Sequence, residues 1–393
     1  MDLTRSLRRA GHLPTGVDRV EAAYLKALIA DPVPVFGLIR TSLGYLLLDP
    51  AVLTIFAQQL RGVSPFPPTG ILSGMHRNVT TEVRQALSSA RRLAIGRVAP
   101  WGLPKLLERH LPPGFAYLNV GHSNLTDRVF RAVKSVSGAH ISVLIHDAIP
   151  LDFPQFQRPN TVRPFEEKLR RAQAHADLII YNSADTKRRA EAHMQSWGTV
   201  PNGVVAHLGT TISEPDASKL PPGLSPTEPY FVTVGTIEPR KNHAFLLDLW
   251  AQMGPAAPLL LICGNRGWNN REVFDQLDGL SATSRVKEVN DLSDAALSRL
   301  VAGAQGLLFP SHAEGFGLPA IEALTLGTPV FCNDIETFRE ILGEKAVYAT
   351  VSDSYLWLST IEAWTTRSHA KREKIRFDAP KWDDHFKTVL RLT

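Results

Sequence analysis

Runs of apolar, strand-like residues alternate with helical patterns along almost the whole chain of 393 residues. A β-then-α rhythm predicts parallel sheets with helices on both faces, which is the doubly wound α/β architecture. The first two strands lie too close together for a crossover and should form a hairpin. The expected strands cover residues 34–40, 44–50, 115–120, 141–147, 177–183, 204–209, 230–235, 259–264, 285–290, 306–311 and 329–334. The expected helices cover residues 18–30, 50–61, 127–137, 163–175, 184–197, 244–252, 272–277, 294–304, 319–326 and 335–342.

The rhythm is interrupted once, by a proline-rich stretch. Residues 211–229 hold five prolines and no apolar period, which is typical of a linker. The chain is also longer than a single core usually supports. We therefore expect two domains, residues 1–212 and 230–377, joined by a linker over 213–229. Because ligands bind beyond the carboxyl ends of parallel strands, the two domains should face each other across a cleft.

Composition restricts the class of protein. The apolar and charged fractions, 44% and 21%, are those of an ordinary globular protein. Cys263 and Cys332 lie in apolar runs and are expected to be reduced core residues. No run approaches the roughly 18 apolar residues of a membrane-spanning helix, and the first residues lack a signal-peptide core. The expected location is the cytoplasm or the cytoplasmic face of a membrane.

Charge is distributed unevenly along the chain. Residues 1–225 carry 26 Lys and Arg against 17 Asp and Glu, whereas residues 226–393 carry 17 against 21. A basic first half indicates an anionic partner or simply a basic surface. Residues 81–111 combine cations with leucines and Trp101, so they either dock on an anionic membrane or pack their apolar side on the sheet.

The segment EGFGLPAIEALTLGTPV, residues 314–330, carries the clearest chemistry. Glu314 follows an expected strand, and Gly315 and Gly317 would let the backbone approach a ligand and expose its N–H groups. Glu322 lies about one turn inside the following helix, which is bounded by Pro319 and Gly327. A carboxylate beside free N–H groups suits sugar hydroxyls together with a phosphate. The alternative is a loop with a capping acid.

A second candidate group follows the strand at 230–235. Gly235 ends that strand, and Gly264 ends the next one along the chain. Arg240 and Lys241 then precede a helix, where cations, free N–H groups and the helix dipole can together bind an anion. The pattern contains neither a P-loop nor a dinucleotide-binding fingerprint. A solvated, merely basic helix start remains the alternative.

These two segments resemble one enzyme family. VGTIEPRKN (234–242) and LLFPSHAEGFGLPAIEAL followed by GTPV (307–330) are similar to the retaining GT-B glycosyltransferases of family 4. The resemblance implies a GT-B fold, with two Rossmann-like domains facing a cleft. It also implies that Glu314 and Glu322, eight positions apart, frame the donor sugar and the nucleotide ribose, with the backbone of Gly315, Phe316, Gly317 and Leu318 beside the donor.

The first domain supplies further matches to the family. LIHDAIPLDFP (144–154) resembles the segment whose His146 and Asp147 point toward the donor sugar, and TGVDRVE (15–21) resembles a glycine turn whose Gly16 approaches the donor phosphates. The usual two-glycine loop is reduced here to one glycine. LNVGHSNL (118–125) and YNSADT (181–186) resemble bacterial mannosyl- and rhamnosyl-type transferases of surface polysaccharides. Residues 378–393 resemble the helix that returns to the first domain.

The resemblance implies a specific reaction. A hexosyl group would pass from a nucleotide diphospho-sugar, with a GDP-sugar favoured, to a hydroxyl of a glycan or lipid-linked glycan. Glu314, His146, Arg240 and Lys241 would act in catalysis. The donor would contact Gly16, Asp147, Gly235, Gly264, Arg240, Lys241, Gly315, Phe316, Gly317, Leu318 and Glu322. No cofactor is expected. The acidic pattern at residues 334–336 suits a helix start better than a metal site, so cations and N–H groups should replace Mg²⁺.

Other functions are open on the sequence alone. Within the same fold, the chain could be a sugar-nucleotide epimerase or a phosphorylase, although no lysine is marked out for a pyridoxal cofactor. It could also be a catalytically silent subunit that only binds a sugar nucleotide. A nucleic-acid binder would explain the basic half, but no basic and aromatic platform is present in the sequence.

Overall fold

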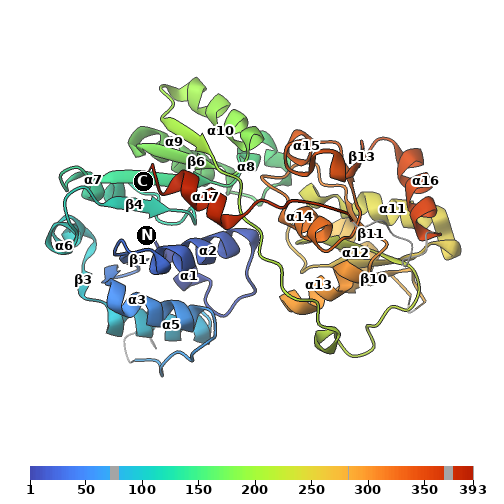
Figure 1. Ribbon diagram of the computed structural model, residues 1–393, viewed down its shortest axis with the longest axis horizontal. Coiled ribbons are helices and arrows are strands. Elements are labelled where there is room, and N and C mark those ends of the chain that lie inside the picture. The colour runs from blue at the N-terminus through green and yellow to red at the C-terminus, as the bar shows by residue number, and fades with distance from the viewer. Residues whose placement is uncertain (71–78, 282, 367–374, 393) are drawn as a thin grey trace.

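The molecule consists of two lobes lying side by side (Figure 1). A computed structural model describes residues 1–70, 79–281, 283–366 and 375–392. The first lobe contains the strands up to residue 205, and the second contains those from residue 230 onward. Between them the chain is irregular, apart from the 3-10 turn η3 (Ala217–Lys219).

The second lobe contains one parallel sheet, with strand order β10-β9-β8-β11-β12-β13. Its strands are almost fully buried, as expected where helices cover both faces of a parallel sheet. Helices α11, α12 and α16 pack on one face, and α13, α14 and α15 on the other. The strands are β8 (Tyr230–Val234), β9 (Leu259–Cys263), β10 (Val286–Val289), β11 (Gly306–Phe309), β12 (Val330–Asn333) and β13 (Val347–Ala349). The helices are α11 (His243–Met253), α12 (Arg271–Asp278), α13 (Asp294–Gly303), α14 (Leu318–Thr325), α15 (Glu336–Leu342) and α16 (Ser354–Thr365).

The first lobe contains a four-stranded parallel sheet, β4-β5-β6-β7, and a separate three-stranded antiparallel sheet, β1-β2-β3. The predicted hairpin is present as β1 and β2, but it does not pair directly with the parallel strands. Residues 1–3 lie between the two sheets: Asp2 N donates to the Leu118 carbonyl at 2.9 Å, and Leu3 N donates to the Leu38 carbonyl at 2.8 Å. The strands are β1 (Gly37–Thr41), β2 (Gly44–Leu48), β3 (Gly96–Val98), β4 (Ala116–Asn119), β5 (His140–Ile145), β6 (Leu178–Tyr181) and β7 (Asn202–Val205).

Helices cover both sides of the two sheets of this lobe. Two of them start at sequence-encoded caps that matter for the site: Thr15 forms a capping box with Asp18 at α2, and the Ser183 hydroxyl accepts from Thr186 N at α10. The helices of this lobe are α1 (Thr4–Arg8), α2 (Gly16–Ala30), α3 (Pro50–Leu60), α5 (Thr81–Leu93), α6 (Leu103–His110), α7 (Asp127–Lys134), α8 (Ile149–Asp152), α9 (Val162–His175) and α10 (Ala184–Trp197).

The chain end returns to the first lobe as α17 (Trp382–Val389), drawn in red across the blue and green elements (Figure 1). The Tyr24 hydroxyl of α2 lies 2.5 Å from His385 Nε2, and the ring of Trp382 packs edge-on against Tyr24. His385 Nδ1 also lies 3.1 Å from the Ala206 carbonyl. The strand expected at 204–209 is β7, which pairs with β6 and ends at Val205.

The amphipathic segment 81–111 folds against the sheet. Its helices α5 and α6 bury Leu87, Leu103, Leu106 and Leu107 in the lobe's core, so most of its apolar side chains cannot face a membrane. Trp101 differs, with 83% of its surface exposed. No helix in the described part of the chain is long and apolar enough to span a bilayer.

The two cysteines are buried and unpaired, as predicted. Cys263 lies on β9 and Cys332 on β12, where both behave as small apolar residues of the sheet.

Candidate active site

Glu314 and the two predicted cations meet at the carboxyl edge of the second sheet. Glu314 follows β11, whereas Arg240 and Lys241 lie in the 3-10 turn η4 (Pro239–Lys241) after β8. Lys241 Nζ is 2.5 Å from one carboxylate oxygen of Glu314, and Arg240 Nη1 is 2.7 Å from the other. Arg240 is also held by Glu238 at 2.6 Å. The sequence predicted that Arg240 and Lys241 bind an anion. In this structure, the anion that they bind is the Glu314 carboxylate.

This cluster is strongly charged although it is nearly buried. Burial by itself would raise the pKa of Glu314, but Arg240 and Lys241 outweigh that effect and hold its pKa at about 2. Burial lowers the pKa of Lys241, and Glu314 opposes that shift. Two cations and two carboxylates, Glu238 and Glu314, are thus fixed together, which is a preorganised arrangement able to stabilise new negative charge.

Two predicted glycines make room for these side chains. Gly235 has φ +140°, and a side chain there would press on Lys241 at 3.2 Å. A Cβ on Gly264 would lie 2.0 Å from the Gly235 carbonyl oxygen. The close packing of these two strand ends therefore requires glycine at position 264, and glycine at position 235 leaves room for the Lys241 side chain.

The turn Gly315–Leu318 of the second lobe is in contact with the first lobe. A Cβ on Gly315 would lie 2.1 Å from the His146 carbonyl, so the backbones touch directly. Gly317, at φ +90°, is the N-cap of α14, and Leu318 begins that helix. Phe316 is buried, and its ring lies 5.9 Å from that of His207. The predicted N–H-rich turn is present at a helix N-terminus, beside Glu314.

His146 and Asp147 directly follow β5 and lie beside Gly315. His146 Nε2 lies 2.7 Å from the Val120 carbonyl, and burial lowers its pKa to about 4, so the ring is neutral at pH 7. Burial raises the pKa of Asp147 to about 6, against the pull of Arg240. The structure therefore brings His146, Asp147, Gly315 and the Glu314 cluster together.

The sequence analysis did not select three side chains that bind the backbone here, two of which join the lobes. Asn182 donates to the His146 carbonyl at 2.8 Å, while Ser183 and Thr186 donate to the Gly315 carbonyl at 3.0 and 3.2 Å. All three belong to YNSADT, which the sequence singled out only as a family-like segment. The signal was present, but a serine before a helix is also an ordinary cap.

Glu322 lies apart from the Glu314 cluster, on α14. Arg19 of α2 donates to Glu322 at 2.9 Å and to Asp294 at 2.5 Å. Gly16 begins α2, and a Cβ there would be 3.7 Å from Leu318, so the N-termini of α2 and α14 lie near each other. Gly16 is thus placed opposite the predicted turn, and Arg19 is a site residue that the sequence analysis missed.

Glu322 should respond to pH near neutrality. Burial raises its pKa to about 7, against the pull of Arg19. If Glu322 binds a hydroxyl of the nucleotide ribose, as the family resemblance implies, donor binding should strengthen as pH rises through about 7, because a carboxylate accepts hydroxyl hydrogen bonds better than the protonated acid. Glu322→Gln should raise the donor KM by roughly tenfold, lower kcat less, and flatten this part of the kcat/KM profile.

Steady-state kinetics between pH 6 and 8 would check this prediction about Glu322, with the exposed Glu362 of α16 changed to Gln as the control. An unchanged donor KM in Glu322→Gln would contradict a ribose contact.

The lobes are held closely together beside the site. Glu340 of α15 accepts from Ala184 N at 2.6 Å and Asp185 N at 3.0 Å, at the start of α10. The cavity between the lobes that includes Glu314 and Asp147 has a volume of about 20 Å³, and so does the one that includes Arg19 and Glu322. Neither cavity could hold a nucleotide sugar in this arrangement.

Residues 216–376 match the family model for glycosyl transferases group 1. This segment is a group 1 glycosyltransferase domain. The chain is 30% identical to the serotype-specific mannosyltransferase WbdA of Escherichia coli over 263 residues, which are 61% of this chain and 32% of WbdA. It is 33% identical to the O-antigen chain mannosyltransferase RfbU of Salmonella typhimurium over 34% of this chain and 38% of RfbU. The chain thus spans about a third of the length of these relatives.

Solved structures agree with the predicted GT-B fold. Anabaena HepE, solved with UDP and glucose, matches 97% of this chain and 96% of its own with a TM-score of 0.62 at 16% identity. Sucrose-phosphate synthase of Thermosynechococcus elongatus matches 75% of this chain and 76% of its own, with a TM-score of 0.54 at 21% identity. The glycosyltransferase domain and the first lobe together therefore have the GT-B fold.

Proposed function

We propose that the chain is a retaining, metal-independent glycosyltransferase that moves a hexosyl group, with mannose favoured, from a GDP-sugar to a hydroxyl of a glycan or lipid-linked glycan. The observation that carries this proposal is the buried Glu314–Arg240–Lys241 cluster at the carboxyl edge of the glycosyltransferase domain. The mannosyltransferases of O-antigen synthesis among the relatives support mannose and surface polysaccharide.

The cluster suits a departing diphosphate. The bond from the anomeric carbon to the acceptor oxygen forms while the bond to the phosphate oxygen breaks, and the hydroxyl proton leaves with the diphosphate. Arg240, Lys241 and the N–H groups of residues 315–318 would stabilise the charge that develops. Glu314 would orient the two cations and contact sugar hydroxyls, and Glu322 would bind the ribose.

The lobes must separate for a donor to bind, given the small cavities between them. The contacts to break include those at the start of α10, where Ser183 and Thr186 donate to the Gly315 carbonyl and Glu340 accepts from Ala184 N and Asp185 N. They also include the pairs of Arg19 with Glu322 and Asp294. Lobe motion of this kind is ordinary for two-domain enzymes.

A panel of GDP-, UDP-, dTDP- and ADP-sugars, tested by thermal shift, would identify the donor, because a ligand of the native state stabilises it by RT ln(1 + [L]/Kd). We expect the GDP-sugar to give the largest shift, and slow hydrolysis of that donor without an acceptor or added metal. Stabilisation without any hydrolysis would instead indicate a silent binding subunit. Conversion to another sugar nucleotide would indicate an epimerase, and no shift with any donor would contradict the proposal.

We further infer that the first lobe rests on the cytoplasmic face of an anionic membrane. Support comes from Trp101, which is exposed together with Ile95, Arg97, Lys105 and Arg109 of the same segment, whereas most other apolar residues of 81–111 are buried. Flotation with vesicles should increase with the fraction of anionic lipid and decrease with salt. Trp101→Ala should weaken it, whereas exposed Tyr355→Ala on the second lobe should not.

A further inference from the structure

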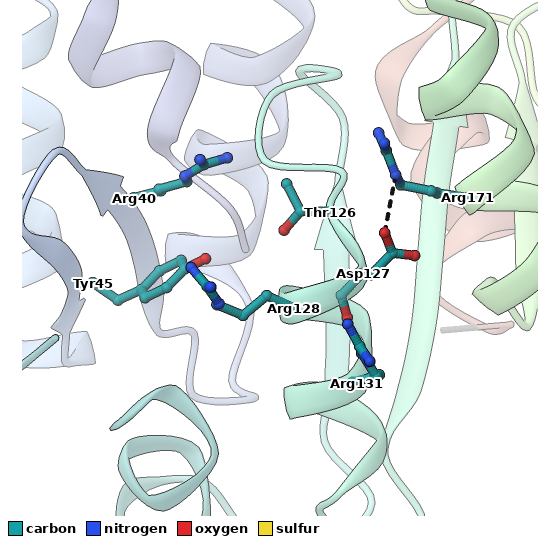
Figure 2. A pocket seen from close by; sticks show the side chains of 7 residues that line it. All are labelled: Arg40, Tyr45, Thr126, Asp127, Arg128, Arg131 and Arg171. Atoms are coloured by element: carbon teal, nitrogen blue, oxygen red, sulfur yellow. Dashed lines mark hydrogen bonds and ion pairs between the residues drawn. The ribbon is translucent and has the colours of Figure 1, made fainter. Parts of the chain in front are cut away.

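The first lobe contains a second basic site that none of the roles above uses. It is a pocket of about 310 Å³ between the β1–β2 hairpin and helices α7 and α9 (Figure 2). Arg40 lies near the end of β1, Arg128 and Arg131 lie in the first turns of α7, and Arg171 comes from α9. The buried Tyr45 of β2 also lines the pocket.

The positive charge of this pocket is poorly compensated. Asp127 is the one carboxylate among its lining residues, and it is shared by Arg171 at 3.2 Å and His175 at 3.4 Å. Arg40 and Arg128 form no ion pair within the described residues. Arg131 Nε only donates to the Asp127 carbonyl, at 3.3 Å. Arg171 is paired with Asp127 and also with Glu167, at 3.2 Å, so the arginines of the pocket without an ion pair among the described residues are Arg40, Arg128 and Arg131.

The pocket has further features of an anion site. The side chain of Thr126 caps α7, whose N-terminus opens at the pocket, so the helix dipole adds to the field of the arginines. Figure 2 shows the guanidinium groups of Arg40 and Arg128 on the Tyr45 side of Thr126, with that of Arg128 beside the Tyr45 ring. Planar guanidinium groups bind phosphate through paired hydrogen bonds, which a surface of lysines would not provide.

A run of cations connects this pocket with the reaction centre. Burial lowers the pKa of Arg8, and the nearby Arg40 lowers it further. Burial likewise lowers the pKa of Lys168, with additional contributions from Arg8, Arg5 and Arg171. Arg5 packs against Gly121 and adds positive field at His146. Positive charge on α1 thus acts near the pocket through Arg8 and at His146 through Arg5, which is itself paired with Asp18 at 2.7 Å.

We propose that this pocket binds a phosphate or diphosphate group carried by the acceptor. The inference rests on the proposed function, because it assigns the pocket to the acceptor of that transfer. A phosphorylated acceptor would bring the anion that the arginines lack, and the cations of α1 and Lys168 would lie along its route to the anomeric carbon. A phosphate-binding role also accounts for the concentration of positive charge in the first half of the chain.

Calorimetric titration of the full chain with inorganic pyrophosphate tests the pocket directly. Arg128→Gln combined with Arg131→Gln should weaken one binding event by at least roughly tenfold, since each lost charged hydrogen bond costs about that much. Arg61→Gln combined with Arg271→Gln removes the same charge from exposed positions outside the pocket and should leave binding unchanged. Lys241→Ala should also keep this event, because it alters only the proposed donor site.

Two further measurements separate the alternatives. Unchanged pyrophosphate binding in the Arg128/Arg131 variant would overturn the inference. If the variant lost only its flotation with phosphatidylglycerol vesicles, the inference would also fail, and the arginines would be assigned to the lipid surface. The GDP-sugar thermal shift, measured on the same variant, should persist. If the wild-type protein shows no thermal shift with any sugar nucleotide, but the variant still binds pyrophosphate more weakly than the wild type, the proposed function fails while the anion site stands.

Discussion

Replacing Lys241 by alanine should lower kcat/KM for glycosyl transfer by about 10²–10³, the usual cost of removing one charge-stabilising group from a preorganised site. Lys241 Nζ is 2.5 Å from Glu314 and lies over the ring of Phe309, so its charge is held in one place. The loss should appear mainly in kcat, because the charge on the diphosphate develops as the sugar leaves.

The Lys241 variant should also remain folded. Glu314 keeps its second partner, Arg240, at 2.7 Å, so no buried carboxylate is left alone. Circular dichroism and thermal unfolding would verify this, with the exposed Lys345→Ala as the control. If a folded Lys241→Ala protein transferred sugar at the wild-type rate, the charge cluster would have no part in the reaction.

The sequence was most informative where chemistry follows a strand. Glu314, Lys241 and His146 each come shortly after an apolar run, and parallel strands bring such positions to one edge. The pairing of Glu314 with Lys241 was not predictable, because 73 residues separate them and neither local pattern refers to the other. Arg240 and Lys241 were therefore interpreted as a site for a ligand's anion, and their protein partner was missed.

Arg19 shows a second limit of the sequence. It is an exposed-looking cation on an amphipathic helix, and its partner Glu322 is 303 residues away. Nothing in the local pattern distinguishes such a residue from an ordinary surface arginine. Gly16, three positions earlier, was predicted only because TGVDRVE resembles a glycine turn of the family, and the structure places it as the first residue of α2.

The fold of the first lobe shows a similar limit. The hairpin was predicted from the spacing of two strand-like runs, and it is present. Its connection to the parallel sheet depends on residues 1–3, which are too few to show any period. The amphipathic segment 81–111 could face either a membrane or the sheet, since both bury the same leucines, and only the packing of Leu103 and Leu106 in the core distinguishes the two.

Glu314→Ala should be the most damaging change at the site, because it affects stability and catalysis together. It leaves Arg240 with Glu238 and the Ala313 carbonyl, and leaves the nearly buried Lys241 without an ion-pair partner among the described residues; breaking such a pair typically costs about 3–5 kcal/mol. A nucleoside diphosphate would replace the missing negative charge. GDP should therefore raise the Tm of Glu314→Ala by more than that of the wild type, although kcat should fall by about 10²–10³.

Thermal unfolding with and without GDP, combined with steady-state kinetics, separates the two roles of Glu314. Glu314→Gln keeps the shape of the side chain but removes its charge, so it should show the same kcat defect with a smaller loss of stability. Glu362→Ala, on the exposed face of α16, controls for loss of a carboxylate. If Glu314→Ala instead raised the donor KM and spared kcat, it would be the ribose ligand, and Glu322 would be the acid beside the reacting sugar.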